Sequence, residues 1–485
     1  MDSNLKQKTT SGLKWSAIER LATQAIQLVV MLVLARMLGP QAFGLIGMLA
    51  IFIAVSQVFV DSGLSSALIR KLDRTELDYS TAFYFNIAIA LICYLILYIS
   101  APYIADFYKQ PELTSLTRVL ALVIIVNALA IIQRTKLSIN MDFKTQAKAS
   151  LAAVCISSIV AFAMAYYGFG VWSLIGQTLT YTLCNVIFLN ILHKWLPKLS
   201  FNFDSFKQLF GFGSKLMLSG LIDSIYQNIY QIVIGKKFNV LDVGYFTQAN
   251  QLAKTPAITM TSIIQRVTYP MLSSIQNDEQ RLNHAYLLTL RLSAAIIFPL
   301  LFGLAVVADP LIPELLGYEW KSASLLTSIL ATGLLLYPIH AINLNYLQVK
   351  GRSDLFLRLE IIKKVITTII LLITIPYGIN AICIGIVIQS YLALVINTYY
   401  NGKIGSLSGS SQLRALLPIW LIAITTCSIA WLITNLISVS PWISIILIII
   451  MATLFYILSF RFLQKDLYKY IILNILPKKL TKIYE

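Results

Sequence analysis

Apolar segments long enough to cross a bilayer, which takes about 20 residues, follow one another along almost the whole chain. Fourteen such segments cover residues 14–38, 43–69, 80–100, 116–133, 149–168, 171–192, 212–235, 243–273, 286–308, 323–347, 358–377, 379–400, 415–437 and 441–463. A segment surrounded by lipid must satisfy its own backbone hydrogen bonds, and runs of this length do so as α-helices. The sequence therefore predicts an all-α polytopic membrane protein with about fourteen transmembrane helices.

Composition agrees with a membrane protein and argues against other classes. Of the 485 residues, 58% are hydrophobic and 12% are charged, whereas soluble domains carry about 25% charged residues. The net charge of +17 is dispersed among the loops, which is not the clustered basic face of a nucleic-acid-binding protein. The five cysteines lie within apolar runs and the three histidines are far apart, so we expect no nucleic-acid partner, no disulfide framework and no metal site.

Lysine and arginine alternate between loops in the way that orients membrane proteins. The basic loops carry Lys6 and Lys8; Arg70, Lys71 and Arg74; Arg134, Lys136, Lys144 and Lys148; Lys194, Lys198 and Lys207; Lys350, Arg352 and Arg358; and the tail from residue 461 to 482. Basic loops stay in the cytoplasm. With an even number of spans, both termini should be cytoplasmic. The first apolar run lacks a small-residue cleavage site after it, so it is expected to be a retained span.

A weak internal repeat divides the chain. At an offset of 200 residues Gln27 corresponds to Gln227, Arg36 to Lys236, and Gly44 to Gly244. Each block would contain six helices, so the blocks share one orientation and are related by an axis along the membrane normal. We therefore predict an N-terminal six-helix lobe at 1–200, a C-terminal six-helix lobe at 201–402, and two additional helices with a basic cytoplasmic tail at 403–485, with a cavity between the lobes.

Polar side chains form stripes on the first two helices of each block. An ionised side chain at bilayer depth costs about 2.5–3.5 kcal/mol on insertion scales, so these stripes should face water or protein. The uncharged or acidic members expected to line the cavity are Glu19, Thr23, Gln27, Gln57, Gln227 and Gln265. The basic members are Arg20, Lys215 and Arg266, and the aspartates are Asp61 and Asp223.

Two structural explanations of the charged positions stay open. Lys215, Arg291, Arg20 and Arg266 could extend to the lipid headgroups, and Asp61 could pair with Arg20, or Asp223 with Lys215. The functional hypothesis for the aspartates is that Asp61 or Asp223 carries a coupling proton or sodium ion.

Three stretches carry a family resemblance. They are SGLKWSAIERLATQAIQLVVMLVLARMLGPQAFGL near the N-terminus, YYGFGVWSL at 166–174 and QVKGRSDLFLRLE at 348–360. With the arrangement of six, six and two helices, the chain resembles the Wzx-type polysaccharide flippases, and is similar to colanic acid and O-antigen exporters of the multidrug/oligosaccharidyl-lipid/polysaccharide exporter superfamily.

The resemblance implies a transporter in the bacterial inner membrane, not an enzyme. Its substrate would be an undecaprenyl-pyrophosphate-linked oligosaccharide used for surface polysaccharides, moved by alternating access through a cationic central cavity. Arg20, Lys215 and Arg266 would be the substrate-binding cations. Membrane lipids, a polysaccharide polymerase and a chain-length regulator would be partners. No cofactor is implied, and coupling to a proton or sodium gradient is left open.

Other functions remain as alternatives. A multidrug antiporter or a peptidoglycan-precursor flippase of the same superfamily would share the fold, although a drug exporter would favour an acidic lining. A membrane glycan polymerase or ligase should carry a large external loop for catalysis, whereas the longest external loops here, 101–115 and 309–322, are short. The sequence does not identify the sugar.

Overall fold

The computed structural model describes residues 3–405, 407–437 and 439–474, and these residues form helices and short connections without any strand. The α-helices are α1 (Ser3–Asp61), α2 (Leu64–Arg70), α3 (Glu76–Tyr108), α4 (Leu113–Leu120), α5 (Leu122–Ile139), α6 (Phe143–Tyr166), α7 (Trp172–Leu192), α8 (Phe203–Lys237), α9 (Val240–Ser274), α10 (Glu279–Leu316), α11 (Lys321–Leu334), α12 (Tyr337–Val349), α13 (Ser353–Thr374), α14 (Ile379–Ile404), α15 (Gly409–Leu436), α16 (Pro441–Leu463) and α17 (Lys465–Asn474). Two short 3₁₀ turns, Tyr318–Trp320 and Ile375–Tyr377, precede α11 and α14.

These helices account for the fourteen predicted spans. Within the described residues, ten helical segments are long and apolar enough to cross a membrane. The segment Trp15–Arg70 among them holds two predicted spans, because α1 changes direction at Gly39, where φ is 69° and Pro40 follows. The remaining three predicted spans are α8, α9 and α13, which are helical but more polar. The prediction of an all-α polytopic membrane protein is confirmed.

The second predicted span, 43–69, is wrong as a single helix. The helix ends at Asp61, Ser62 and Gly63 have φ of 47° and 68°, and α2 begins at Leu64. At this break the backbone of α8 approaches closely, because a Cβ on Gly63 would lie 2.4 Å from the carbonyl oxygen of Gly213. This crossing requires two residues without side chains and a left-handed backbone at one of them.

One predicted basic loop is also shorter than expected. Arg134 and Lys136 lie in α5, and Lys144 and Lys148 lie in α6, so that only residues 140–142 connect the two helices. Lys136 pairs with Glu76 at 2.6 Å, and the Trp195 indole donates to the same carboxylate at 2.9 Å. Lys136 therefore links α5 to the start of α3 through Glu76, which a count of loop charges does not reveal.

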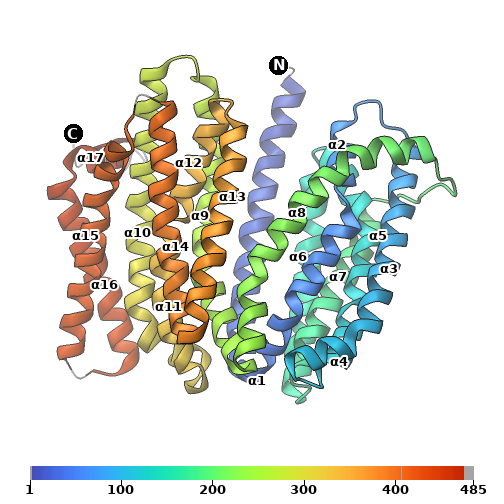
Figure 1. Cartoon of the computed structure of the whole chain (residues 1–485), viewed down its shortest axis with the longest axis horizontal. Helices are drawn as coiled ribbons and strands as arrows, with labels where there is room; N and C mark the ends of the chain where they lie inside the picture. The colour runs from blue at the N-terminus through green and yellow to red at the C-terminus, as the bar shows by residue number, and fades with distance from the viewer. Residues whose placement is uncertain (1–2, 406, 438, 475–485) are drawn as a thin grey trace. The chain divides into compact units, whose positions relative to one another are not determined.

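Contacts divide the chain into a first unit, Met1–Gly244, and a second unit, Tyr245–Glu485. In the first unit, α8 packs against α1, α2 and α3. In the second, α10 packs against α11, α15 and α16, and α15 and α16 lie side by side at the C-terminal end of the chain (Figure 1). The predicted domain limits of 1–200, 201–402 and 403–485 stay a prediction.

The repeat has a structural counterpart inside the first unit. A Cβ on Gly44 would lie 2.0 Å from the carbonyl oxygen of Val240, and a Cβ on Gly244 would lie 2.1 Å from that of Pro40. Positions 40 and 240, and 44 and 244, are equivalent at the offset of 200 residues found in the sequence. A contact in which each partner repeats the other's role is the signature of two-fold symmetry.

Candidate functional site

The stripe on the first half of α1 is only partly exposed. Arg20 and Gln27 are exposed, whereas Glu19 and Thr23 are half-buried, as is Gln57 on the second half of α1. In the part of the chain that the structure describes, Thr23 Oγ1 and Gln57 Nε2 are buried without a hydrogen-bond partner. Buried polar atoms of this kind are usually satisfied by protein or water, so these positions suit contact with a polar ligand or solvent.

The stripe on α8 lies beside the second half of α1. The two helices run antiparallel, because Gly213 meets Gly63 and Gly220 meets Val58. Lys215, two residues from the first of these contacts, is exposed. Asp61, at the last residue of α1, is half-buried and accepts a hydrogen bond from the Ser65 hydroxyl. The fold thus places one predicted substrate-binding residue, Lys215, and one predicted ion-coupling residue, Asp61, on adjacent helices.

Asp223 and Gln227 continue this stripe, and both side chains are exposed. They follow Lys215 on α8 by eight and twelve residues in the sequence, which is a little more than two and three helical turns. All three therefore lie along one side of the helix. The helical spacing that suggested a polar face is preserved in the structure.

The predicted cations are not neutralised by carboxylates. Among the ion pairs formed by the described residues, none includes Arg20, Lys215 or Arg266. The same set contains no pair between Arg20 and Asp61, which had been an open structural explanation. Exposed guanidinium and ammonium groups that form none of these ion pairs can contact an anionic ligand.

Glu19 belongs to a hydrogen-bond network that sequence reasoning missed. The Ser150 hydroxyl donates to Glu19 at 2.8 Å, the Asn185 amide contacts Ser150 at 3.4 Å, and Arg134 donates to Asn185 at 2.7 Å. These residues come from α1, α6, α7 and α5. Because these residues are far apart in the sequence, no sequence pattern predicted their hydrogen bonds. Arg134 had also been assigned to a loop. The network links a carboxylate to a cation inside the first unit.

The second unit contains a polar cavity of about 550 Å³ beside the predicted residue Gln265. Gln265 is half-buried, whereas its neighbour Arg266 is exposed. The other polar residues that line this cavity come from α9, α12, α13 and α14: Thr261, Tyr337, His340, Asn345, Gln348, Glu360, Lys363, Gln389 and Ser390. Glu360 and Lys363 form an ion pair. The sequence had indicated Gln265 as a cavity-lining residue and had argued against metal binding by the histidines. It did not predict this cavity.

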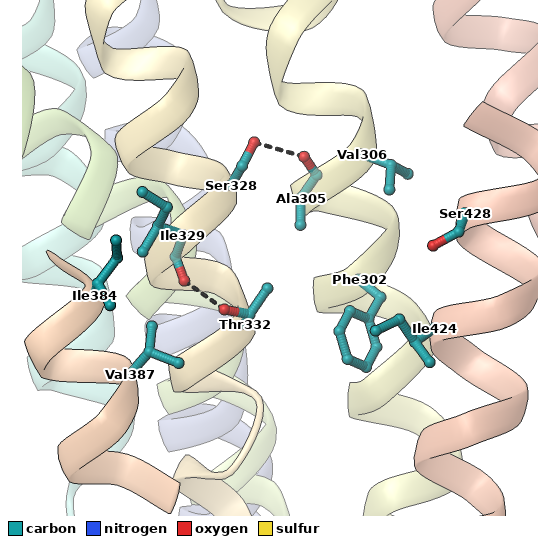
Figure 2. A pocket seen from close by; sticks show the side chains of 10 residues that line it. All are labelled: Phe302, Ala305, Val306, Ser328, Ile329, Thr332, Ile384, Val387, Ile424 and Ser428. Carbon is teal, nitrogen blue, oxygen red and sulfur yellow. Dashed lines mark hydrogen bonds between the residues drawn. The ribbon is translucent and has the colours of Figure 1, made fainter. Parts of the chain in front are cut away.

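A second cavity of about 430 Å³ is apolar and lies among α10, α11, α14 and α15 (Figure 2). The Ser328 hydroxyl donates to the Ala305 carbonyl at 2.6 Å, and the Thr332 hydroxyl donates to the Ile329 carbonyl at 2.7 Å. The hydroxyl groups of Ser328 and Thr332 are therefore satisfied by backbone carbonyls. The remaining lining is mainly aliphatic and aromatic, formed by Phe302, Val306, Ile384, Val387 and Ile424 with Ser428. Such a cavity suits an apolar chain and not a charged headgroup.

The described residues contain no cluster of three or more histidine, cysteine or carboxylate groups that could hold a metal ion. The five cysteines are free thiols.

Comparison with known proteins identifies a family and a fold. A family model described as polysaccharide biosynthesis protein matches residues 33–325. The chain is 27% identical over 73% of its length to the teichuronic acid biosynthesis protein TuaB of Bacillus subtilis, covering 73% of that protein. It is 25% identical over 86% of its length to the lipopolysaccharide biosynthesis protein WzxC of Escherichia coli, covering 85% of that protein.

A solved structure is similar over almost the whole chain. The lipid II flippase MurJ, in an inward closed conformation, matches with a TM-score of 0.73 and covers 94% of this chain and 99% of its own. Sequence identity in that match is 16%, so it establishes the fold alone.

Proposed function

This chain belongs to the polysaccharide biosynthesis protein family, and from that premise we propose that it carries undecaprenyl-pyrophosphate-linked oligosaccharide repeat units across the bacterial inner membrane. It is a multi-pass membrane flippase of the multidrug/oligosaccharidyl-lipid/polysaccharide exporter superfamily. The repeat units would pass by alternating access through a cationic cavity. A polymerase and a chain-length regulator would then receive them in the outer leaflet.

The observation that carries this proposal is the set of exposed cations on membrane helices, Arg20, Lys215 and Arg266, without carboxylate partners among the described residues. A pyrophosphate is a compact anion, and guanidinium groups bind it through two parallel hydrogen bonds. A positively charged drug molecule would be repelled by the same groups. We propose that the three cations contact the pyrophosphate during the transport cycle.

We propose that Asp61 or Asp223 takes part in coupling to a proton or sodium gradient. The position of Asp61 supports this, because its carboxylate is half-buried at the C-terminal end of α1. A half-buried carboxylate on a membrane helix is a candidate site for a proton or cation. The polar side chains of Thr23, Gln27, Gln57, Gln227 and Gln265 would line the path of the headgroup.

Deletion of the gene tests the substrate. Because the repeat unit could no longer reach the outer leaflet, we expect surface polysaccharide to be lost and lipid-linked repeat units to accumulate in the cytoplasmic leaflet. Restoring the gene should reverse both effects. The measurements are surface-polysaccharide staining and mass spectrometry of extracted lipids.

The same deletion separates the alternatives. A multidrug antiporter would leave the polysaccharide intact and change drug sensitivity. A peptidoglycan-precursor flippase would stop cell-wall synthesis and cause lysis. A polymerase or ligase would leave single repeat units at the cell surface. Any of these three results in place of the accumulated lipid would contradict the proposed substrate.

We also propose that both termini are cytoplasmic. The basic loops support this orientation. Reporter domains fused after Ser115 and after Tyr318 should be active outside the cytoplasm, and those fused after Lys144 and after Arg352 should be active inside it. Alkaline phosphatase and green fluorescent protein fusions give the two readouts. Reversal of either pair would contradict the arrangement.

A further inference from the structure

The polar cavity of the second unit is rich in side-chain amides. Its volume of about 550 Å³ is lined by Gln265 of α9, Asn345 and Gln348 of α12, and Gln389 of α14. Ligand pockets in proteins typically enclose about 300–1,000 Å³, so the cavity can hold a small molecule. Each amide offers two donors and an acceptor without carrying a charge. Such a wall is complementary to a ligand whose own polar groups are uncharged donors and acceptors.

Asn345 has hydrogen-bonding capacity that the protein leaves unused. Its side chain is 7% exposed, and its Nδ2 is buried without a hydrogen-bond partner among the described residues. Buried donors are normally satisfied by protein or water. A ligand that enters the cavity can supply the missing acceptor. Two residues away, Asn343 faces α10 instead, where its Oδ1 accepts from the Tyr286 hydroxyl at 2.7 Å.

His340 belongs to the same wall as a neutral ring. The Ser390 hydroxyl donates its one proton to the Gly333 carbonyl at 2.7 Å, so it accepts from His340 Nε2 at 3.2 Å. The Asn397 amide nitrogen can only donate, and it lies 3.3 Å from Nδ1. These bonds occupy both ring nitrogens and join α12 to α14. The wall is therefore ordered before a ligand arrives, which lowers the cost of binding.

The charges in the cavity wall cancel. Glu360 and Lys363 form an ion pair, and they are the charged side chains among the described residues that line the cavity. A phosphate group would find no unpaired cation there. A lipid tail would leave the amides without partners, and it suits the apolar cavity of Figure 2 better. The lining thus favours an uncharged ligand with many hydroxyl groups, which is the chemistry of a sugar ring.

The cavity lies next to a proposed phosphate-binding residue. Gln265 lines the cavity, and the following residue on α9, Arg266, is exposed. The Cα atoms of consecutive residues are about 3.8 Å apart. In the proposed substrate, the first sugar is bonded directly to the pyrophosphate. A pyrophosphate held by Arg266 would therefore carry a sugar ring to the edge of the cavity at Gln265.

We propose that this cavity binds the first sugar of the substrate as an uncharged ring. The inference rests on the proposed function for the lipid pyrophosphate to which that sugar is attached. A sugar hydroxyl has one proton and two lone pairs, so it accepts from Asn345 Nδ2 and donates to the amide oxygen of Gln389. The pyrophosphate stays outside the cavity, at Arg266.

Two binding probes test the site in the full chain in detergent micelles. One probe is the lipid-linked oligosaccharide extracted from the deletion strain, and the other is undecaprenyl pyrophosphate, which carries no sugar. Thermophoresis of labelled protein measures both affinities. We expect the natural protein to bind the oligosaccharide probe more tightly. Asn345→Leu should weaken that binding about twofold to tenfold, which corresponds to one uncharged hydrogen bond, and should leave the affinity for undecaprenyl pyrophosphate unchanged.

Gln389→Leu gives an independent test from α14, where the side chain is half-buried. It should lower the affinity for the oligosaccharide probe by a similar factor. The unfolding temperature without ligand separates recognition from folding. Asn345→Leu removes a buried donor that has no partner in the described chain, so this temperature should not fall. A fall together with equal losses for both probes would give Asn345 a structural role and overturn the site.

Two further variants are matched controls. Asn343→Leu makes the same change on the same helix, but its side chain contacts Tyr286 and does not line the cavity. The ratio of the two affinities should therefore stay as in the natural protein. Arg266→Ala should weaken both probes by a similar factor, because both carry the pyrophosphate.

The possible failures are distinct. Binding of neither probe by the natural protein would contradict the proposed function, and this inference with it. Equal affinities of the natural protein for the two probes would overturn the sugar site alone. The same conclusion would follow if Asn345→Leu and Gln389→Leu weakened both probes equally, or weakened neither.

Discussion

Removing the guanidinium groups of Arg20 and Arg266 together should reduce surface-polysaccharide export by more than a hundredfold while leaving the protein in the membrane. Each charge-assisted contact with phosphate is worth about 1.5–3 kcal/mol, or roughly tenfold to a hundredfold in affinity. Both side chains are exposed, so their truncation leaves no buried partner behind. The loss should therefore appear in transport and not in folding.

Single substitutions separate charge from geometry at the same positions. Arg20→Lys keeps a positive charge but loses the planar pair of donors, so export should fall only partly, whereas Arg20→Ala and Arg266→Ala should each impair it severely. The measurement is complementation of a strain lacking the gene, with the amount of membrane protein determined in parallel.

Arg281→Ala is the matched control. Arg281 is 75% exposed near the start of α10, and it lies 3.9 Å from Asp278 in a surface ion pair. Such pairs contribute little, about 0–1 kcal/mol, so export should stay close to normal. Near-normal export by the Arg20→Ala, Arg266→Ala double variant would show that these arginines do not bind the substrate.

The parts of the fold that follow local sequence rules could be predicted. Apolar length marks a membrane helix because an unsatisfied backbone is costly in lipid, so a single sequence indicates where the helices lie. Helical spacing also placed Arg20 and Lys215 on polar faces. The equivalence of Gly44 and Gly244 was visible as an offset, and the structure explains it by reciprocal backbone contacts.

What could not be predicted depends on residues that are distant in sequence. Glu19 meets Ser150, and through it Arg134, only after α1, α5, α6 and α7 have packed together. His340 read alone is an isolated histidine in an apolar run. In the structure its two ring nitrogens contact Ser390 and Asn397, which both lie on α14. No periodicity within one helix carries that information.

The crossing of α1 and α8 leads to the second large effect, which concerns stability. Gly213→Ala should lower the thermal unfolding temperature of the purified protein markedly, because its Cβ would lie 2.5 Å from the carbonyl oxygen of Ser62 and 3.1 Å from the carbonyl carbon of Gly63. Both atoms belong to backbone, which cannot turn aside as a side chain can. Forcing extra volume into a packed contact typically costs about 1–3 kcal/mol.

Gly211→Ala, two residues earlier on α8, is the matched control. A Cβ at that position meets nothing within 4 Å. Replacing glycine by alanine in an open helical position stabilises by about 0.5–1 kcal/mol, since it reduces the freedom of the unfolded chain. The two substitutions are chemically identical, so intrinsic helix propensity cancels in the comparison. Equal unfolding temperatures for the two variants would show that α8 does not approach the 62–63 turn closely.

Two further glycines extend the comparison into a ranking. Gly63→Ala should destabilise more than Gly213→Ala, because it adds the cost of a left-handed backbone, about 1–2 kcal/mol, to a clash at 2.4 Å. Gly220→Ala should destabilise less, because its Cβ would meet the Val58 side chain at 3.2 Å, which can shift. The expected order of unfolding temperatures is Gly211→Ala highest, then Gly220→Ala, Gly213→Ala and Gly63→Ala. Only a crossing in which backbone meets backbone at 63 and 213 produces that order, since helix propensity alone would rank Gly211, Gly213 and Gly220, which all lie on α8, together.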